Sequence, residues 1–434
     1  MSTHRLNSWV QLSLLFLAWT TSLVLVAGMT SSANGQLPFQ GVNLSGAEFG
    51  SQNLPGTYYL VGPGPYDYIY PPSSDVDYFI DRGMNTFRLP FRWERLQRSL
   101  NGPLHPAELA RMNAFVDHTT GRGAHVILDP HNFAQYVING NVNAIGGGNV
   151  TSSHLADFWG KLAAEFSDNP NVIFGLMNEP IGANHPNGIT TEDWLVAANA
   201  SIAAIRAANA DNLILVPGNG FTGAHSWDQS FYGTPNADVM LNIVDTGDNF
   251  AFEVHQYLDG NSSGQSASIA GNDPEIGRDR LIGFTQWLQA NGYRGFLGEF
   301  GAANSTIGDA GNQIGDETIN IMLDYIEAND DVWIGWAWWG GGTWWSENYL
   351  FAIDPRSNGD DQPSMLLLEP RLVGLVDTVL LGDCNLDGTV GFLDISPLIG
   401  FLTSGDYLDQ ADCNQDGVVN FFDIAPFIQI LTDN

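Results

Sequence analysis

From Phe39 to about Pro355, short apolar runs alternate with longer segments that have the periodicity of amphipathic helices. This alternation is typical of βα units arranged around a parallel sheet. The apolar runs predict eight strands, at residues 41–44, 86–89, 125–129, 172–176, 213–216, 252–254, 295–298 and 332–336. The longer segments predict helices, and the clearest are 106–122, 153–166 and 191–209, the last with capping residues at 190–192.

Eight βα units within about 300 residues predict an α/β fold of the (β/α)₈ TIM-barrel class. A doubly wound open sheet is the alternative. It is disfavoured because no Gly-rich dinucleotide or phosphate fingerprint follows the first strand.

The two ends of the chain depart from this pattern. Residues 1–35 begin without acids, continue with an apolar run over Val10–Gly28 and end in small residues, which predicts a secretory signal peptide. The alternative is a membrane anchor, because the run is about long enough to cross a bilayer. The barrel is expected over residues 36–355, followed by a connector over 356–381 and a small separate domain over 382–434 that contains an internal repeat.

Composition narrows the classes of partner. The chain has 48 acidic residues against 15 Lys and Arg, a formal charge of −33. Such a field repels phosphate backbones and anionic membrane surfaces, so neither nucleic acid nor, for the mature form, a membrane is expected as a partner. Two cysteines, Cys384 and Cys413, do not make a disulfide framework, and whether they pair stays open. The barrel is expected to be monomeric.

Chemistry in a barrel of this class lies at the carboxyl ends of the strands. Polar side chains occur there in five of the predicted strands, at Arg88, at His131 and Asn132, at Asn178 and Glu179, at Glu253, His255 and Tyr257, and at Glu299. Two carboxylates from different strands suit hydrolysis of a glycosidic bond, which needs one acid and one base or nucleophile. His125 and Asp129, which lie earlier on the third strand, are expected to be structural residues.

An ordered set of motifs over nearly all of residues 39–355 resembles glycoside hydrolase family 5. The motifs are Phe87–Pro90, Pro130–Asn132, Asn178–Pro180, His255–Asp259 and Gly298–Gly301. More narrowly, Gly46–Gly56 and Trp338–Trp345 resemble the fungal-type cellulases of that family. The resemblance implies Glu179 as acid/base and Glu299 as nucleophile, without a catalytic cofactor. It also implies a substrate-binding set that consists of Arg88, His131, Asn178, His255, Tyr257 and Trp339.

The tryptophan cluster from Trp333 to Trp345 has an interpretation of its own, because an aromatic face can cover the apolar C–H surface of a sugar ring. Strand periodicity predicts that alternate members up to Trp339 belong to the core. Trp344 and Trp345, on the following loop, are the better candidates for a substrate groove.

Each C-terminal repeat has oxygen-bearing residues at positions 1, 3, 5 and 12 of a loop and Gly at position 6, which predicts an EF-hand-like calcium site. The predicted ligands of two structural calcium ions are Asp383, Asn385, Asp387 and Asp394, then Asp412, Asn414, Asp416 and Asp423. Position 12 is Asp and one apolar helix follows each loop, so the α-helical pair resembles a dockerin, which implies a cohesin-type scaffold partner. A calcium-stabilised cap without a partner is the alternative.

Together these patterns predict a secreted, retaining endo-β-1,4-glucanase whose substrate is a β-glucan polysaccharide. Within the enzyme class, a mannanase or a mixed-linkage β-glucanase could use the same machinery. A carbohydrate-binding protein without hydrolytic activity is the alternative of another class, since fold does not dictate function. Such a binding protein would not need both Glu179 and Glu299.

Overall fold

The computed structural model describes residues 37–51, 54–58, 67–303, 314–372, 381–382, 384–385, 390–404, 407–414 and 417–433. All structural statements below concern these residues. The predicted signal peptide at 1–35 lies outside them, as do Asp383, Asp387 and Asp416 of the predicted calcium ligands.

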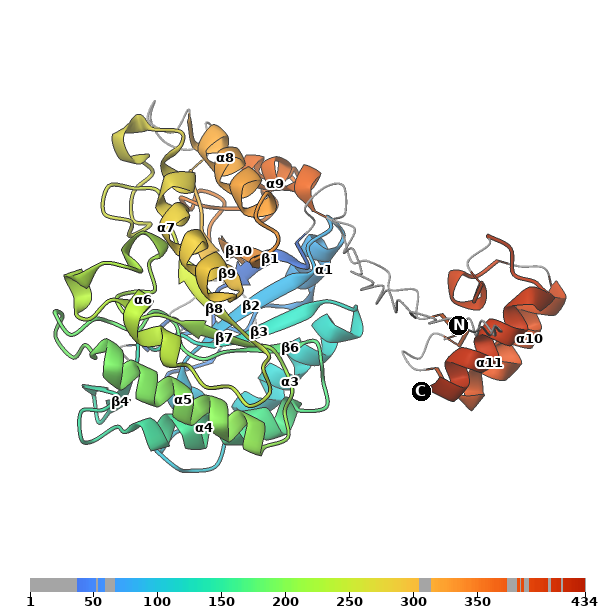
Figure 1. Ribbon diagram of the computed structural model, residues 1–434, viewed down its shortest axis with the longest axis horizontal. Helices are drawn as coiled ribbons and strands as arrows, with labels where there is room; N and C mark the ends of the chain where they lie inside the picture. Colours follow the sequence, from blue (N-terminus) through green and yellow to red (C-terminus); the bar gives the residue numbers. More distant parts are fainter. Residues whose placement is uncertain are drawn as a thin grey trace, which may run out of the picture. The chain divides into compact units, whose positions relative to one another are not determined.

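Eight parallel strands form a closed barrel in the order β1-β10-β9-β8-β7-β6-β3-β2 (Figure 1). Their bounds are Phe39–Leu44 (β1), Thr86–Phe91 (β2), His125–Pro130 (β3), Val172–Gly175 (β6), Ile214–Pro217 (β7), Phe250–His255 (β8), Gly295–Phe300 (β9) and Trp333–Gly341 (β10). All eight predicted strands are therefore present, and β10 continues past its predicted end. The predicted TIM-barrel class is confirmed.

Helices follow the strands and surround the barrel (Figure 1). Their bounds are Ser73–Ile80 (α1), Trp93–Leu96 (α2), Pro106–Gly121 (α3), Ser152–Phe166 (α4), Thr191–Ala207 (α5), Asn236–Val239 (α6), Ile276–Asn291 (α7), Gly315–Glu327 (α8) and Pro363–Leu368 (α9). The Thr190 side chain caps α5 by accepting a hydrogen bond from the Asp193 amide, as its sequence predicted. An antiparallel hairpin, β4 (Gln135–Ile138) and β5 (Asn141–Ala144), was not predicted.

Apolar side chains fill two separate spaces. A small cluster, which includes Ile127, Ile173, Leu215 and Phe296, fills part of the barrel interior, and a much larger one lies between strands and helices. Trp333, Trp336 and Trp338 of β10 belong to the larger cluster and are fully buried, whereas Trp339 is only partly buried. The predicted alternation does not hold, because the register of β10 against β9 shifts between Trp333 and Gly335 and again between Trp336 and Trp338. The first tryptophan of β10 outside the core is Trp339.

A bulge in β9 changes which way its side chains point. Strand β8 pairs Val254 with Leu297 but His255 with Glu299, and β10 pairs Trp336 with Leu297 but Trp338 with Phe300. Leu297 and Phe300 belong to the outer apolar cluster, so the two residues between them, Gly298 and Glu299, both face inward. A bulge re-aims a side chain without ending the sheet, and here it directs Glu299 into the barrel mouth.

Part of the predicted connector packs on the barrel. Met365 and Leu368 of α9 are fully buried in the outer cluster, and the Gln40 side chain donates to the carbonyl of Arg371 at 3.1 Å. We therefore propose that the barrel unit extends to about residue 372. None of the helices in the described ranges is long and apolar enough to cross a membrane.

The C-terminal unit has two helices, Ile395–Ser404 (α10) and Ile424–Asp433 (α11), each preceded by a 3₁₀ turn at Phe392–Asp394 or Phe421–Asp423. Its own small core includes Cys384, Leu398, Cys413 and Phe427. The predicted helical class of this unit is confirmed.

Leu368→Ala should lower the free energy of unfolding of the barrel by about 2–5 kcal/mol, because it leaves a cavity in the outer cluster. Urea unfolding followed by tryptophan fluorescence measures this. Leu366→Ala on the same helix is the matched control, since Leu366 is 55% exposed, and it should have almost no effect. Equal effects of the two variants would place α9 outside the barrel's cooperative unit.

Candidate active site

Glu299, at the end of β9, lies in the barrel mouth and is 4% exposed. One carboxylate oxygen accepts a hydrogen bond from Arg88 Nη1 at 2.9 Å, and the other accepts from the Tyr257 hydroxyl at 2.8 Å. His255 Nδ1 lies 3.5 Å from the second oxygen. Two donors therefore fix both oxygens of Glu299 in place.

Glu179 follows β6 and faces the same space. Its Oε1 lies 2.8 Å from His255 Nδ1, and its side chain is 19% exposed, more than that of Glu299. Its φ of 40° is in the left-handed region that residues with a side chain rarely adopt. One ligand-type atom each from Glu179, His255 and Glu299 lies within 4.8 Å of the others. The two glutamates thus have carboxylate oxygens close to one another.

Arg88 lies beneath both glutamates and is fully buried. Its Nη1 also donates to Asn43 Oδ1 at 2.8 Å, and its Nη2 donates to Asn178 Oδ1 at 2.9 Å. Carboxylates of Asp129 and Glu253 lie 3.2 and 3.1 Å from its nitrogens. Every edge of the guanidinium group therefore faces an oxygen from a different strand or strand end.

A ring of contacts fixes the orientation of His131. Because Asn178 Oδ1 accepts from Arg88, the NH₂ group of the Asn178 side chain faces His131. Its Nδ2 lies 3.1 Å from His131 Nε2. His131 Nε2 must then accept, so Nδ1 carries the proton and donates to Asp129 Oδ2 at 2.8 Å. Burial holds the pKa of His131 well below its ordinary value, which fits this neutral tautomer.

His255 has the opposite charge state. Burial alone would lower its pKa, but the carboxylates of Glu299, Glu179 and Glu253 outweigh burial and raise it to about 10. A cationic imidazole has no lone pair for a metal ion, so the trio of Glu179, His255 and Glu299 is not a metal site in this state. Burial raises the pKa of Glu299 despite the opposing effects of His255 and Arg88.

Trp339 forms one wall of the mouth. Its ring stacks on His131 with centroids 5.7 Å apart, and its Nε1 donates to the Tyr349 hydroxyl at 3.0 Å. Trp344 stacks on Phe49, and Trp345 stacks on Tyr349 at 3.8 Å. Since one face of each loop tryptophan is already covered by another ring, each has at most one face left for a ligand.

The structure thus brings Glu179, Glu299 and the six predicted binding residues to one end of the barrel. Three further members were not among the predicted site residues. Asn43 was not singled out, and Glu253 was noted at a strand end without a role. Asp129 was expected to be structural, but it contacts both Arg88 and His131. Each of the three is a polar residue within a mostly apolar strand, which is the signal that sequence offers for them.

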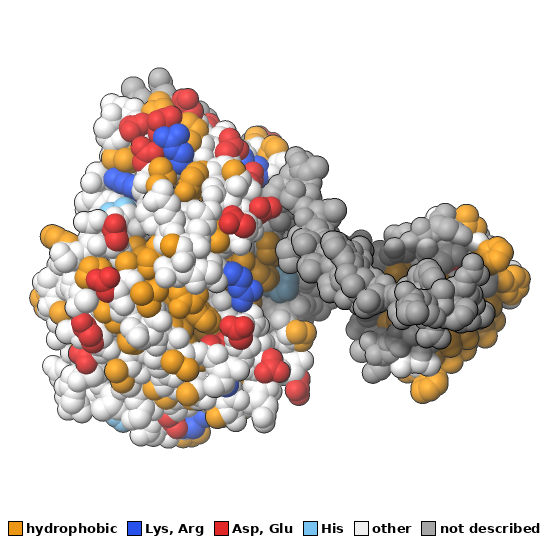
Figure 2. All heavy atoms as spheres, in the orientation of Figure 1, with side chains coloured by type: hydrophobic (Ala, Val, Ile, Leu, Met, Phe, Trp, Pro, Cys, Tyr) orange, Lys and Arg blue, Asp and Glu red, His pale blue; other side chains and the backbone are white. Residues whose placement is uncertain are grey.

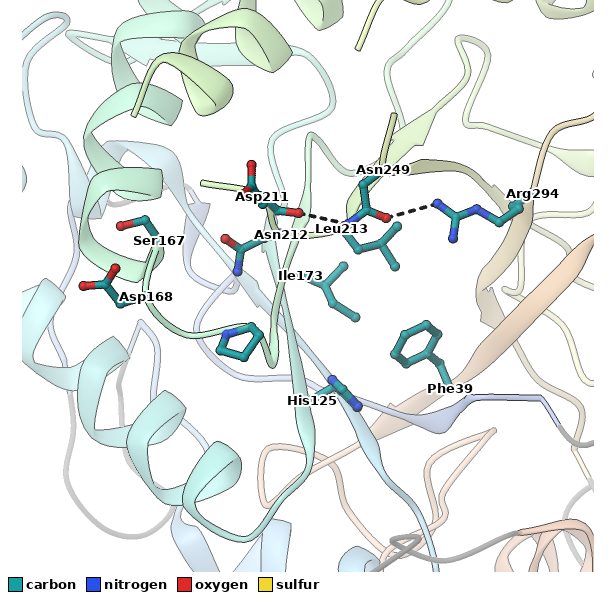
Figure 3. Close-up of a pocket in the computed structure, with 11 residues that line it drawn as sticks. Phe39, His125, Ser167, Asp168, Ile173, Asp211, Asn212, Leu213, Asn249 and Arg294 are labelled. Carbon is teal, nitrogen blue, oxygen red and sulfur yellow. Dashed lines mark hydrogen bonds between the residues drawn. The ribbon is translucent and has the colours of Figure 1, made fainter. Parts of the chain in front are cut away.

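The opposite end of the barrel has a different character. A pocket of about 510 Å³ lies there among the starts of the strands, with Phe39, His125, Ile173 and Leu213 around it (Figure 3). Its Asn249 links the Asp211 carbonyl to Arg294 through hydrogen bonds. Asp168 and Asp211 also line this pocket, which lies at the end of the barrel where residues serve stability.

In the C-terminal unit, the residue at loop position 12 has the same contacts in both repeats. Asp394 accepts from the amides of Asn385 and Gly391 at 3.0 and 2.8 Å, and Asp423 accepts from those of Asn414 and Asn420 at 3.1 and 2.7 Å. Asp412 accepts from the Gly417 amide at 2.8 Å. Both Cys384 Sγ and Cys413 Sγ lie against the Gln410 carbonyl, at 4.0 and 3.6 Å.

The acids of this unit suit a hard cation. Asp394, Asp412 and Asp423 are at most 4% exposed, and residues 381–434 contain no Lys, Arg or His. Buried carboxylates without a basic residue in the same domain need another source of positive charge. Carboxylate and amide oxygens are the ligands that calcium prefers.

Comparison with known proteins agrees with this geometry. Residues 42–342 match the family model for cellulases of glycosyl hydrolase family 5, and residues 381–432 match that for the dockerin type I domain. The chain is similar to endo-β-1,4-glucanase B of Emericella nidulans, with 36% identity over 77% of this chain and 93% of that protein.

Solved structures give the same result. An endo-β-1,4-glucanase of Xanthomonas axonopodis pv. citri is 43% identical, with a TM-score of 0.71 over 79% of this chain and all of that chain. The Pseudomonas stutzeri endoglucanase Cel5A, solved with cellobiose, is 32% identical, with a TM-score of 0.67 over 78% of this chain and 94% of that chain. The chain therefore belongs to the cellulases of glycosyl hydrolase family 5 and carries a C-terminal dockerin type I domain.

Proposed function

We propose that this chain is an endo-β-1,4-glucanase that cleaves internal bonds of glucans with retention, with Glu179 as acid/base and Glu299 as nucleophile. The proposal depends above all on the close approach of the two carboxylates, each of which has one oxygen within 4.8 Å of an oxygen of the other. Retaining enzymes have carboxyl groups about 5–5.5 Å apart, whereas inverting enzymes need about 6.5–9.5 Å to admit a water molecule. The endoglucanase relatives support the substrate class.

In the first step, Glu299 attacks the anomeric carbon while Glu179 donates its proton to the leaving oxygen. The sugar then forms an ester with Glu299. In the second step, Glu179 takes a proton from water, which attacks the same carbon and releases Glu299. Arg88 and Tyr257 donate to Glu299 before and after attack, so that its oxygens need no reorganisation. The difference in exposure suits these roles, because the proton donor must reach the leaving group.

The remaining residues are proposed to bind the sugar. Asn178 has its amide group held by Arg88 and His131, beside the nucleophile, where a 2-hydroxyl would lie. Trp339 offers an aromatic face against which a glucose ring can stack. His131 and His255 flank the two glutamates from β3 and β8.

Glu299→Gln should abolish release of reducing sugar, because an amide cannot act as nucleophile. Glu179→Gln should lower kcat by about 10²–10⁴-fold, the contribution typical of general acid catalysis. Both are compared with wild type on a soluble β-1,4-glucan, a mixed-linkage glucan and a β-mannan. NMR of the first product in the wild-type reaction should show the β-anomer.

Ordinary activity in either variant would refute the assigned roles. An initial α-anomer would refute retention while leaving the hydrolase intact. Preference for mannan would change the substrate but not the mechanism, and inactivity of the wild type on all three polymers would favour the carbohydrate-binding alternative.

We also propose that the C-terminal domain holds two calcium ions. Dockerin type I domains bind calcium. The predicted ligands are repeated in the two loops, and the position-12 aspartates are already ordered by their own loop amides. We also propose that the N-terminal segment, residues 1–35, exports the chain.

Chelation by EDTA should therefore unfold the C-terminal domain and leave the barrel folded, because metal binding in such loops is coupled to folding. Calorimetry of the full chain should show one transition that moves to lower temperature on chelation and another that does not. The double variant Asp394→Asn, Asp423→Asn should respond less to calcium. Two unchanged transitions would rule out the structural role of calcium.

The same domain is proposed to bind a cohesin-type partner through two apolar pairs. Phe392 and Leu393 are 83% and 75% exposed, and Phe421 and Phe422, at the same positions of the second repeat, are 74% and 77% exposed. Figure 2 shows hydrophobic side chains on the surface of this unit. Large exposed apolar side chains that recur in a repeat are typical of a docking surface.

Replacing all four of these side chains by Ala should strongly weaken binding to a panel of purified cohesin domains, measured calorimetrically with calcium present. Binding depends on their buried apolar area, so loss should exceed about tenfold. Leu366→Ala, an exposed leucine of the barrel, is the control. If the wild type binds no cohesin of the panel, the domain is better explained as a calcium-stabilised cap.

A further inference from the structure

Glu253 is a buried acid for which the proposed mechanism has no use. It lies on β8, two residues before His255, and is 1% exposed. Its Oε1 lies 3.1 Å from Arg88 Nε and 3.5 Å from His255 Nε2. Burial would raise its pKa, but Arg88 and His255 outweigh burial and hold the pKa of Glu253 below its ordinary value. It is therefore an anion beneath the active site that touches two cations.

The neighbouring strand leaves room for this side chain. A Cβ atom on Gly298 would lie 2.1 Å from Glu253 Oε1 and 2.8 Å from Glu253 Cδ. Gly298 does not have a positive φ, so its backbone conformation does not require glycine. Because the β9 bulge turns Gly298 inward, glycine at 298 is what leaves space for the Glu253 carboxylate between Arg88 and His255.

We propose that Glu253 is a positioning residue of the active site, which keeps His255 protonated and orients Arg88 beneath the two catalytic glutamates. This inference rests on the proposed function. Glu253 touches no substrate and acts through these two cations.

Both ring nitrogens of His255 face carboxylates, Nδ1 toward Glu179 and Glu299 and Nε2 toward Glu253. A neutral imidazole has one N–H and could donate to one side only. Other charged or titratable groups near it are Asp129, His131, Tyr257 and Arg88. With Glu253 in place, the cation can donate to Glu179 and stabilise the negative charge that Glu179 acquires when its proton leaves.

The test is Glu253→Gln, which keeps the shape and removes the charge. NMR of ¹⁵N-labelled imidazoles, with the His255 signal identified by its absence in His255→Asn, reports the protonation of His255 directly. In wild type both nitrogens should stay protonated well above neutral pH. In Glu253→Gln the loss of one opposing charge should move this titration to lower pH by about one unit or more.

Gly298→Ala is an independent second variant, since it retains the Glu253 carboxylate but forces it away from its partners. It should shift the His255 titration in the same direction. Glu108→Gln is the matched control, because Glu108 is equally buried and accepts from the Tyr68 hydroxyl at 2.6 Å, far from these cations. It should reduce stability and leave the titration of His255 unchanged.

A His255 titration that is the same in wild type, Glu253→Gln and Gly298→Ala would overturn the inference. A shift of the same size in the His255 titration of Glu108→Gln would also overturn it, because a general loss of stability would then be the cause. Failure of the proposed function is distinguishable, since it would appear as an inactive wild-type enzyme whatever the titration shows. A fall in kcat of Glu253→Gln, with KM little changed, should accompany the shift.

Discussion

The guanidinium group of Arg88 is the interaction on which the active site depends. It is fully buried, and an uncompensated charge there would cost several kcal/mol. The compensation comes from all around the barrel, through Asn43, Asp129, Asn178, Glu253 and Glu299. Each of these oxygens satisfies the cation, and the cation in turn fixes each of them. A closed barrel allows this arrangement, because side chains from strands all around it point to its central axis.

The close packing of carboxylates around Arg88 also sets the charge states of the two active-site histidines. Several acids share a space from which water is excluded, so they cannot all be ionised unless cations intervene. Arg88 supplies one permanent charge, and His255 acquires a second because carboxylates surround it. His131 stays neutral because burial, together with the nearby cations of Arg88 and His255, holds its pKa well below the ordinary value. The two histidines thus differ in charge because carboxylates outweigh burial at His255 but not at His131. The bulge in β9 turns Glu299 toward both cations, Arg88 and His255.

Much of this could be predicted from sequence. All eight strands follow from apolar runs, and the eight predicted site residues meet at one mouth, although their catalytic and binding roles stay predictions. Sequence patterns did not predict the bulge at Gly298, because a one-residue register shift leaves no periodic signal. They also did not identify Asp129 and Glu253 as members of the site, since a single acid in an apolar strand does not reveal which cation it meets. The hairpin β4–β5 was missed because each of its strands has only 4 residues, too few for a clear alternating pattern.

The barrel and the C-terminal unit differ in what neutralises their buried carboxylates. In the barrel, the carboxylates around the mouth meet Arg88 and His255, so protein cations supply the positive charge. In the C-terminal unit, Asp394, Asp412 and Asp423 are as deeply buried, but residues 381–434 supply no basic side chain. Backbone amides satisfy part of each carboxylate, yet an amide dipole does not neutralise a full charge. A small core around Leu398 and Phe427 offers little to offset that cost. The unit should therefore depend on bound cations for stability where the barrel does not.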